Sequence, residues 1–187
     1  PAPVTAFLSS GSKVALLAAL LRFTSYSSGE IWAYLVPMIW ILSVLTMVAG
    51  NLGALAQTRV KRLLAYSSIG QMGYLLMTLV AVKQGGTSAI MFYLAVYALM
   101  DLGAFGALAT LSEEKADLDR LDDFRGLAYS HPWRSGILAL CLISLAGLPP
   151  TAGFIGKFAL FQSVLQGGFV ILAVIGILTV MLSIYFY

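Results

Sequence analysis

The sequence predicts an all-α protein, namely a polytopic bundle of transmembrane helices in which one helix is broken. Three observations predict this class. Of the 187 residues, 60% are hydrophobic and only 10% are charged, whereas about a quarter of the residues in a soluble domain are charged. The apolar residues gather in runs of about 20, the length of a helix that crosses a bilayer. One of these runs, LISLAGLPPTAGFIGKFALF, contains two adjacent prolines and three glycines.

Six candidate spans form a single, partial transmembrane domain. In chain order they cover about residues 3–21, 31–56, 63–82, 87–111, 133–165 and 168–187. The first is apolar apart from SSGSK, the second ends in GNLGALAQ, and the third follows the basic stretch QTRVKR. The fourth follows the turn sequence GG, and the sixth follows QGG. Because the first and last residues both belong to apolar runs, we expect a piece of a longer polytopic protein.

The fifth candidate span, about 133–165, is too long for one straight helix. A continuous helix over this range would measure about 50 Å, against about 30 Å of hydrocarbon. Proline lacks the backbone N–H that a helix needs, and glycine allows backbone angles that a helix does not use. The residues predicted to break this helix, near 147–153, are Gly147, Pro149, Pro150 and Gly153. Unwound backbone at membrane depth is stable only inside protein or beside water, so this segment should face the bundle interior.

The basic residues predict the orientation of the spans. The loops after the second and fourth spans hold most of them: Arg59, Lys61, Arg62, Lys115, Arg120, Arg125 and Arg134. The opposite side holds Lys83, with Arg22 at a span edge. Lysine and arginine accumulate in cytoplasmic loops, so we place the loops after the second and fourth spans on the cytoplasmic side. Single basic residues and one short cluster do not form a stripe that would bind nucleic acid.

Apart from Arg134 at the edge of the fifth span, three charged residues lie within candidate spans: Lys13, Asp101 and Lys157. A lysine or aspartate at the centre of a membrane helix costs about 2.5–3.5 kcal/mol, so each needs a partner or a role. We interpret Lys13, beside Ser12, and Lys157, shortly after the proline pair, as proton-transfer residues, with structural ion pairs as the alternative. Asp101 shares a helix face with Tyr97 and fits either a proton relay or a contact that pairs helices.

The third span carries a polar stripe that includes Ser68 and Gln71. Such a stripe either joins helices through hydrogen bonds or lines a polar pathway. Lys61 is either a topology anchor or a member of such a pathway. Cys141 and His131 are single residues of their kind, so no disulfide framework, metal site or iron–sulfur site is indicated. The sequence contains no recognisable nucleophile–base pair. It also has no visible flavin, nicotinamide or metal motif, so we expect no redox chemistry within this chain.

Five segments of the sequence resemble one known family. They are PAPVTAFLSSGSKVA, GNLGALAQTRVKRLLAYSSIGQMGYLL, LGAFG, DDFRGLA and SLAGLPPTAGFIGKF. Over nearly its whole length the chain resembles the antiporter-like, proton-pumping membrane subunits of respiratory complex I. The resemblance is strongest to the group called subunit N, or subunit 2 in chloroplasts and cyanobacteria. It implies an inverted-repeat fold with a broken helix in each repeat, of which this chain would cover the family's eighth helix to part of its thirteenth.

The resemblance implies roles for individual residues. These subunits move protons across the membrane, driven by quinone reduction in other subunits of NADH-quinone oxidoreductase. Lys13 falls on the family's connecting lysine, Lys157 on the lysine of the broken, exit-side helix, and Lys61 on a basic position at a helix start. Relatives often have histidine in place of Gln71, and asparagine or serine in place of Asp101. Because glutamine does not titrate in the useful range, a proton hop there would need water, and Asp101 could pair with one of the lysines.

The resemblance also implies partners and cofactors outside this chain. NADH, FMN, iron–sulfur clusters and quinone are expected in partner subunits, with no cofactor in this chain. The expected partners are neighbouring antiporter-like subunits, small membrane subunits and the lipid bilayer. We place the protein in a bacterial inner membrane, in preference to an organellar or thylakoid membrane. Two other functions stay open: a subunit of a multisubunit cation/proton antiporter, which shares this fold, and a structural membrane spacer with inert buried charges.

Overall fold

The computed structural model confirms the predicted all-α class. It describes residues 2–27, 29–114 and 120–187, with the side chains of residues 11–27, 29–112 and 120–187. Within these ranges seven longer helices are present: α1 Ala2–Tyr26, α2 Gly29–Leu55, α3 Val60–Leu79, α4 Gly86–Glu114, α6 Pro132–Ala146, α7 Ala152–Gln166 and α8 Val170–Phe186. Short helical turns lie in two of the connections: η1 Val82–Gln84 between α3 and α4, and η2 Leu121–Phe124 with α5 Leu127–Ser130 between α4 and α6.

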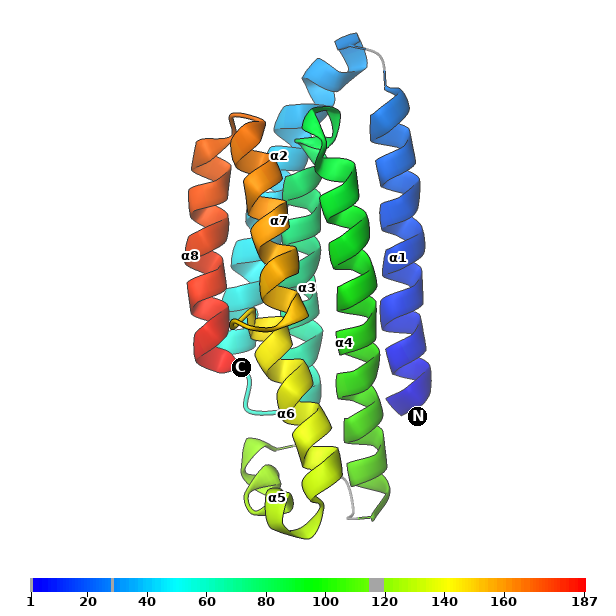
Figure 1. Ribbon diagram of the computed structural model, residues 1–187, viewed down its shortest axis with the longest axis vertical. Helices are drawn as coiled ribbons and strands as arrows, with labels where there is room; N and C mark the ends of the chain where they lie inside the picture. Colours follow the sequence, from blue (N-terminus) through cyan, green and yellow to red (C-terminus); the bar gives the residue numbers. More distant parts are fainter. Residues whose placement is uncertain (1, 28, 115–119) are drawn as a thin grey trace.

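The longer helices stand side by side in one bundle (Figure 1). α1 packs against α4, α2 packs against α3 and α8, and α4 also contacts α6 and α7. In Figure 1, α7 lies above α6, so the two form one interrupted column through the bundle. The side-by-side packing therefore brings helices from both halves of the sequence against α4.

Apart from the α6–α7 connection, which lies midway along the bundle, the connections alternate between its two ends (Figure 1). At one end, Lys83 Nζ donates a hydrogen bond to the Ser27 carbonyl oxygen at 3.3 Å, so the α1–α2 and α3–α4 turns meet. At the other end, the Leu121 N–H donates to the Thr58 carbonyl oxygen at 3.2 Å. The two basic loops predicted on one side of the membrane thus lie at the same end of the bundle. Residues 115–119 of the second loop lie outside the described residues.

The helix bounds differ in detail from the predicted spans. α3 begins at Val60, three residues before the predicted span, so Lys61 lies in its first turn. Among the described residues, Gly29–Leu55 and Gly86–Ser112 are long and apolar enough to cross a membrane by length and composition. α6 and α8 are apolar but shorter. The other predicted spans therefore stay predictions.

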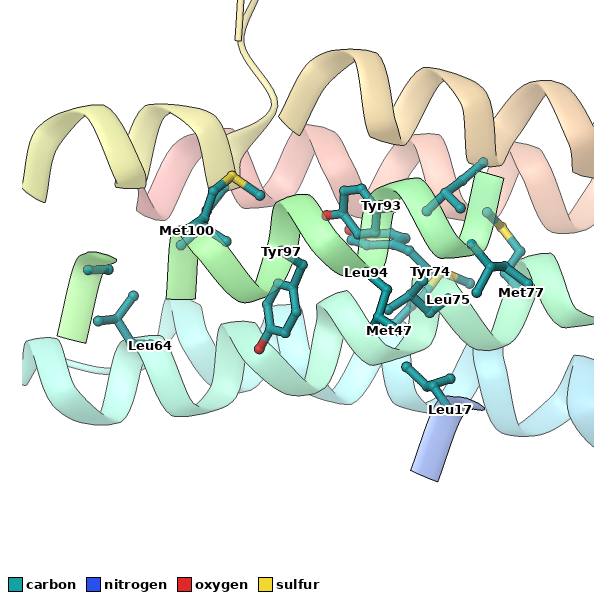
Figure 2. Close-up of a cluster of buried hydrophobic side chains, with 14 of the residues drawn as sticks. Leu17, Met47, Leu64, Tyr74, Leu75, Met77, Tyr93, Leu94, Tyr97 and Met100 are labelled. Carbon is teal, nitrogen blue, oxygen red and sulfur yellow. The ribbon is translucent and has the colours of Figure 1, made fainter. Parts of the chain in front are cut away.

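Glycines let α2 and α3 approach closely. A Cβ on Gly50 would overlap the Gly70 backbone, and a Cβ on Gly73 would lie 2.7 Å from the Met47 nitrogen. Small residues at a crossing are typical of helix packing in membranes, where backbone contact replaces the hydrophobic effect. Three buried tyrosines, Tyr74 of α3 with Tyr93 and Tyr97 of α4, lie in the core of the bundle (Figure 2). Their hydroxyl groups add to the polar side chains buried in the core, such as Gln71 and Asp101.

The predicted break in the fifth span is confirmed between α6 and α7. Gly147 adopts φ 84° and ψ 41°, a left-handed conformation that glycine favours. Its N–H donates to the carbonyl oxygens of Ile143 and Ser144, which closes the last turn of α6. The Pro149–Pro150 peptide, which is cis, follows, and the Thr151 hydroxyl then accepts a hydrogen bond from the Phe154 N–H at the start of α7.

Gly153 corrects one detail of that prediction. It was expected in the unwound segment, but it lies in the first turn of α7. Its N–H donates to Ser144 Oγ at 3.1 Å, and a Cβ there would overlap the Ser144 carbonyl oxygen. The glycine is therefore explained by the close approach of α7 to α6 rather than by an unusual backbone angle.

Candidate functional site

Lys157 lies on α7 with its ammonium group at the break. The residue is 3% exposed, and its Nζ donates to the carbonyl oxygens of Leu145 at 2.7 Å and Ala146 at 3.0 Å. The last carbonyls of a helix have no partner within the helix, and the break leaves these two free to accept. The C-terminal end of α6 also carries a partial negative charge. The break therefore supplies a site that stabilises a buried cation.

A tyrosine completes the surroundings of Lys157. The Lys157 Nζ lies 5.4 Å from the ring centroid of Tyr74, within the range of a cation–π contact. The Tyr74 hydroxyl in turn accepts a hydrogen bond from Asn51 Nδ2 at 3.3 Å. In the described part of the chain, the partners that Lys157 has are thus neutral groups: two carbonyls and an aromatic ring.

Lys13 has a different set of partners. Its Nζ donates to Ser68 Oγ at 2.8 Å and to the Tyr97 hydroxyl oxygen at 3.3 Å. The Asp101 carboxylate, one turn along α4 from Tyr97, interacts electrostatically with Lys13. Asp101 is 2% exposed, so this interaction takes place inside the protein. Lys13 therefore shares its surroundings with a potential counter-charge.

Gln71 lies between these two lysine sites. Its Nε2 donates to the Leu145 carbonyl oxygen at 3.1 Å, and its Oε1 accepts a hydrogen bond from the Tyr93 hydroxyl. Leu145 is thus a shared acceptor for Gln71 and Lys157. Figure 2 shows Tyr93 and Tyr97 on α4, one helical turn apart. Ser68 and Gln71 are likewise one turn apart on α3.

These groups form two hydrogen-bonded clusters, one at each lysine, which we together call the polar string. Its members, from one lysine to the other, are Lys13, Ser68, Tyr97, Gln71, Tyr93, the Leu145 carbonyl and Lys157. They come from α1, α3, α4, α6 and α7. Such an arrangement can hold protons at two lysines, separated by groups that form hydrogen bonds. Five of its members were predicted as site residues from the sequence.

The other predicted residues have different positions. Asp101 adjoins the string next to Tyr97. Ser12 is exposed, and Lys61 is half-buried in the first turn of α3. Lys61 is seven residues from Ser68, which corresponds to about 10 Å along the helix axis. The roles predicted for these residues stay predictions.

Sequence reasoning missed Asn51, Tyr93 and the Leu145 carbonyl as site groups. Two of them had a detectable signal. Asn51 is an amide inside an apolar run, and Tyr93 precedes Tyr97 by four residues, which places both on one helix face. The carbonyl had no signal of its own in the sequence, because its availability depends on where α6 ends.

Comparisons with known proteins match this architecture. The family model described as NADH:quinone oxidoreductase/Mrp antiporter, TM, matches residues 1–183. NADH-quinone oxidoreductase subunit N 1 of Solidesulfovibrio magneticus is 56% identical over 186 residues, covering 100% of this chain and 40% of the relative. NADH-quinone oxidoreductase subunit N of Geotalea uraniireducens is 49% identical, covering 100% of this chain and 39% of the relative. The chain thus spans about 40% of the length of these relatives.

Solved structures have the same fold. A chain of respiratory complex I from Thermus thermophilus with bound aureothin has a TM-score of 0.81 at 34% identity, and covers 100% of this chain and 40% of that chain. A chain of the Mrp complex from Dietzia sp. has a TM-score of 0.75 at 26% identity, and covers 81% of this chain and 28% of that chain. Because the family model matches nearly every residue, the chain belongs to the NADH:quinone oxidoreductase/Mrp antiporter transmembrane family.

Proposed function

We propose that this chain is part of a proton-translocating subunit N of an NADH-quinone oxidoreductase. In this proposal, Lys13 and Lys157 take up and release protons, and protons pass between them through water and the polar groups that lie between them. The observation that supports it best is the polar string, which places a half-buried lysine, Lys13, and a buried lysine, Lys157, each among hydrogen-bonding groups inside the bundle. Relatives with this name match the chain along its whole length.

Several consequences belong to the same proposal. The chain would act as a translocase subunit of an enzyme complex and would itself perform no redox chemistry. NADH, FMN, iron–sulfur clusters and quinone would bind to partner subunits. The partners would be other membrane subunits, and the location a bacterial inner membrane. The bacterial sources of the two relatives support this location.

The test replaces Lys157 in the intact complex, within sealed vesicles. Lys157→Ala removes the proton carrier, and Lys157→Arg keeps the charge but holds its proton, because a guanidinium does not deprotonate in proteins. Groups that transfer protons contribute about 10²–10⁴-fold to rates, so we expect both variants to lower proton pumping by about tenfold or more. The matched control is Lys83→Ala, an exposed lysine at the bundle end.

The readouts separate pumping from assembly. Quinone reduction after uncoupling and the amount of intact complex should change little in both Lys157 variants. Normal pumping by Lys157→Arg would contradict the proposal and favour the membrane spacer, in which the lysine serves only as a fixed charge.

A cation/proton antiporter subunit is the second candidate. The likeness to a chain of the Mrp complex from Dietzia sp. favours it. The two functions differ in their driving force. A subunit of the reductase should move protons only when quinone is reduced, whereas an antiporter should move them in response to a sodium gradient without any electron donor. Sodium-driven proton movement in vesicles that lack NADH and quinone would support the antiporter.

A further inference from the structure

The Leu145 carbonyl accepts hydrogen bonds from two members of the polar string. The two donors are Gln71 Nε2 of α3, at 3.1 Å, and Lys157 Nζ of α7, at 2.7 Å. Both contacts are buried. A carbonyl oxygen has two lone pairs, so it can accept both hydrogen bonds at once. Gln71 and Lys157 therefore meet at a group that only accepts.

This arrangement interrupts the string as a path for protons. A proton moves along a hydrogen-bonded chain only if each link accepts on one side and donates on the other. The Tyr93 hydroxyl donates to Gln71, and Gln71 donates to Leu145, so these donors point towards Lys157. Lys157 donates in the opposite direction. Because the carbonyl has no proton to pass on, no direct hop joins Gln71 to Lys157 in this arrangement.

Gln71 also ties three helices together. It lies on α3, its Oε1 accepts from Tyr93 on α4, and its Nε2 holds the last turn of α6. Gln71 and Tyr93 are at most 2% exposed. An amide does not titrate, so it can hold this geometry at any physiological pH.

The charge of Lys157 and the Gln71 hydrogen bond act on the same oxygen. A hydrogen bond from a charged donor is roughly twice as strong as one between neutral groups. Although the oxygen can accept both hydrogen bonds, the donors share its electron density, so a charged Lys157 weakens the Gln71 hydrogen bond more than a neutral Lys157 does. The Gln71 contact should be weakest when a proton is present on Lys157.

We propose that Gln71 is a positioning residue that holds the Leu145 carbonyl at Lys157. Proton transfer along the polar string stays interrupted until the hydrogen bond from Gln71 to Leu145 breaks. Proton exchange between the Lys13 part and Lys157 follows the release of Gln71 from Leu145, which opens the gap to water. This inference rests on the proposed function, since it concerns the passage between the same two lysines.

The experiment uses three variants in the intact complex. Gln71→Met keeps the length of the side chain and removes both hydrogen bonds. Gln71→His restores hydrogen bonding and adds a group that titrates between about pH 5 and 8. Tyr93→Phe keeps the ring and removes the hydroxyl that holds Gln71. The matched control is Gln84→Met, an exposed glutamine at the bundle end.

The readout is the number of protons pumped per electron, with quinone reduction measured in parallel. We expect Gln71→Met and Tyr93→Phe to lower this ratio by about fivefold, because losing one hydrogen bond shifts the equilibrium of the Gln71–Leu145 contact by about that factor. Gln71→His should pump, but with a ratio that changes across pH 5–8, unlike the wild type. Unchanged ratios in Gln71→Met and Tyr93→Phe would overturn the inference.

Gln71→Met is the variant most at risk of failing to assemble. In that case Tyr93→Phe and Gln71→His decide the test. A wild-type ratio in Tyr93→Phe together with a wild-type pH profile in Gln71→His would overturn the inference. Lys157→Arg is measured alongside. If it pumps normally, the proposed function itself fails; if it is impaired while Gln71→Met and Tyr93→Phe pump normally, only the role of Gln71 fails.

Discussion

At the scale of single residues, Lys13 and Lys157 carry the same charge in different surroundings. Lys13 lies near a carboxylate, Asp101, and donates to two hydroxyl groups. Lys157 is held by backbone carbonyls and by the face of Tyr74. Opposite charges attract strongly inside a protein, whereas carbonyls and rings offer partial charges only. The neutral surroundings of Lys157 suit a residue that must give up its proton as well as hold it.

The Tyr74 ring should therefore matter more than its hydroxyl. Tyr74→Phe keeps the ring near Lys157, whereas Tyr74→Leu removes a cation–π contact worth about 2 kcal/mol when it is shielded from water. We expect the leucine variant to lower the number of protons pumped per electron well below the value of the phenylalanine variant. The amount of intact complex serves as the control for the cavity that leucine leaves. Equal pumping by the two variants would contradict a role for the ring.

At the scale of elements, the break between α6 and α7 depends on Gly147. Its φ of 84° costs a residue with a side chain about 1–2 kcal/mol. A Cβ there would also lie 2.9 Å from Lys157 Cδ and 3.4 Å from Lys157 Nζ. The backbone angle and the space for the lysine therefore require the same glycine.

Gly147→Ala should thus lower both the thermal stability of the complex and its pumping. Gly136→Ala is the matched control, because Gly136 lies within α6 and a Cβ there would meet nothing within 4 Å. Alanine is favoured over glycine inside a helix by about 1 kcal/mol, so this control should be neutral or stabilising. The measurement is the temperature at which pumping is half lost. A Gly147→Ala complex that is as stable and active as the control would argue against this account of the break.

The broken helix shows what could be predicted from the sequence and what could not. Two prolines and a glycine in an apolar run interrupt a helix, and an interrupted helix must face the bundle interior. The break and the burial of Lys157 could therefore be predicted. The end of the break could not, because Thr151 caps α7 and Gly153 joins that helix in an ordinary conformation. The partners of Lys157 could not be predicted either. Carbonyls become acceptors only once the end of α6 and its position against α7 are known.

At the scale of the whole molecule, the polar string depends on packing between distant parts of the chain. Lys13 and Tyr97 are 84 residues apart, and Gln71 and Leu145 are 74 residues apart. Periodicity along each helix predicted which side chains share a face, as for Ser68 with Gln71. It could not predict which faces meet, because that depends on close approaches such as that of Gly50 to Gly70. Hence most members of the string were predicted, but their connections were not.

The arrangement of the bundle also makes a prediction about the membrane. Thr58 and Ser130 are exposed at the end with the basic loops, and Gln84 is exposed at the other end. In a Cys141→Ser background, Thr58→Cys and Ser130→Cys should react with a membrane-impermeant maleimide from the cytoplasmic side. Gln84→Cys should react from the opposite side, because positively charged loops stay cytoplasmic.

Inside-out and right-side-out vesicles provide the two measurements, and labelling after detergent solubilisation checks that each cysteine can be reached at all. One long helix, α3, lies between Thr58 and Gln84 in the sequence, so a crossing by α3 would put the two residues on opposite sides of the membrane. Labelling of Thr58→Cys and Gln84→Cys from the same side would mean that α3 does not cross the membrane. In that case the polar string, which includes Ser68 and Gln71 of α3, could not run through the bilayer interior.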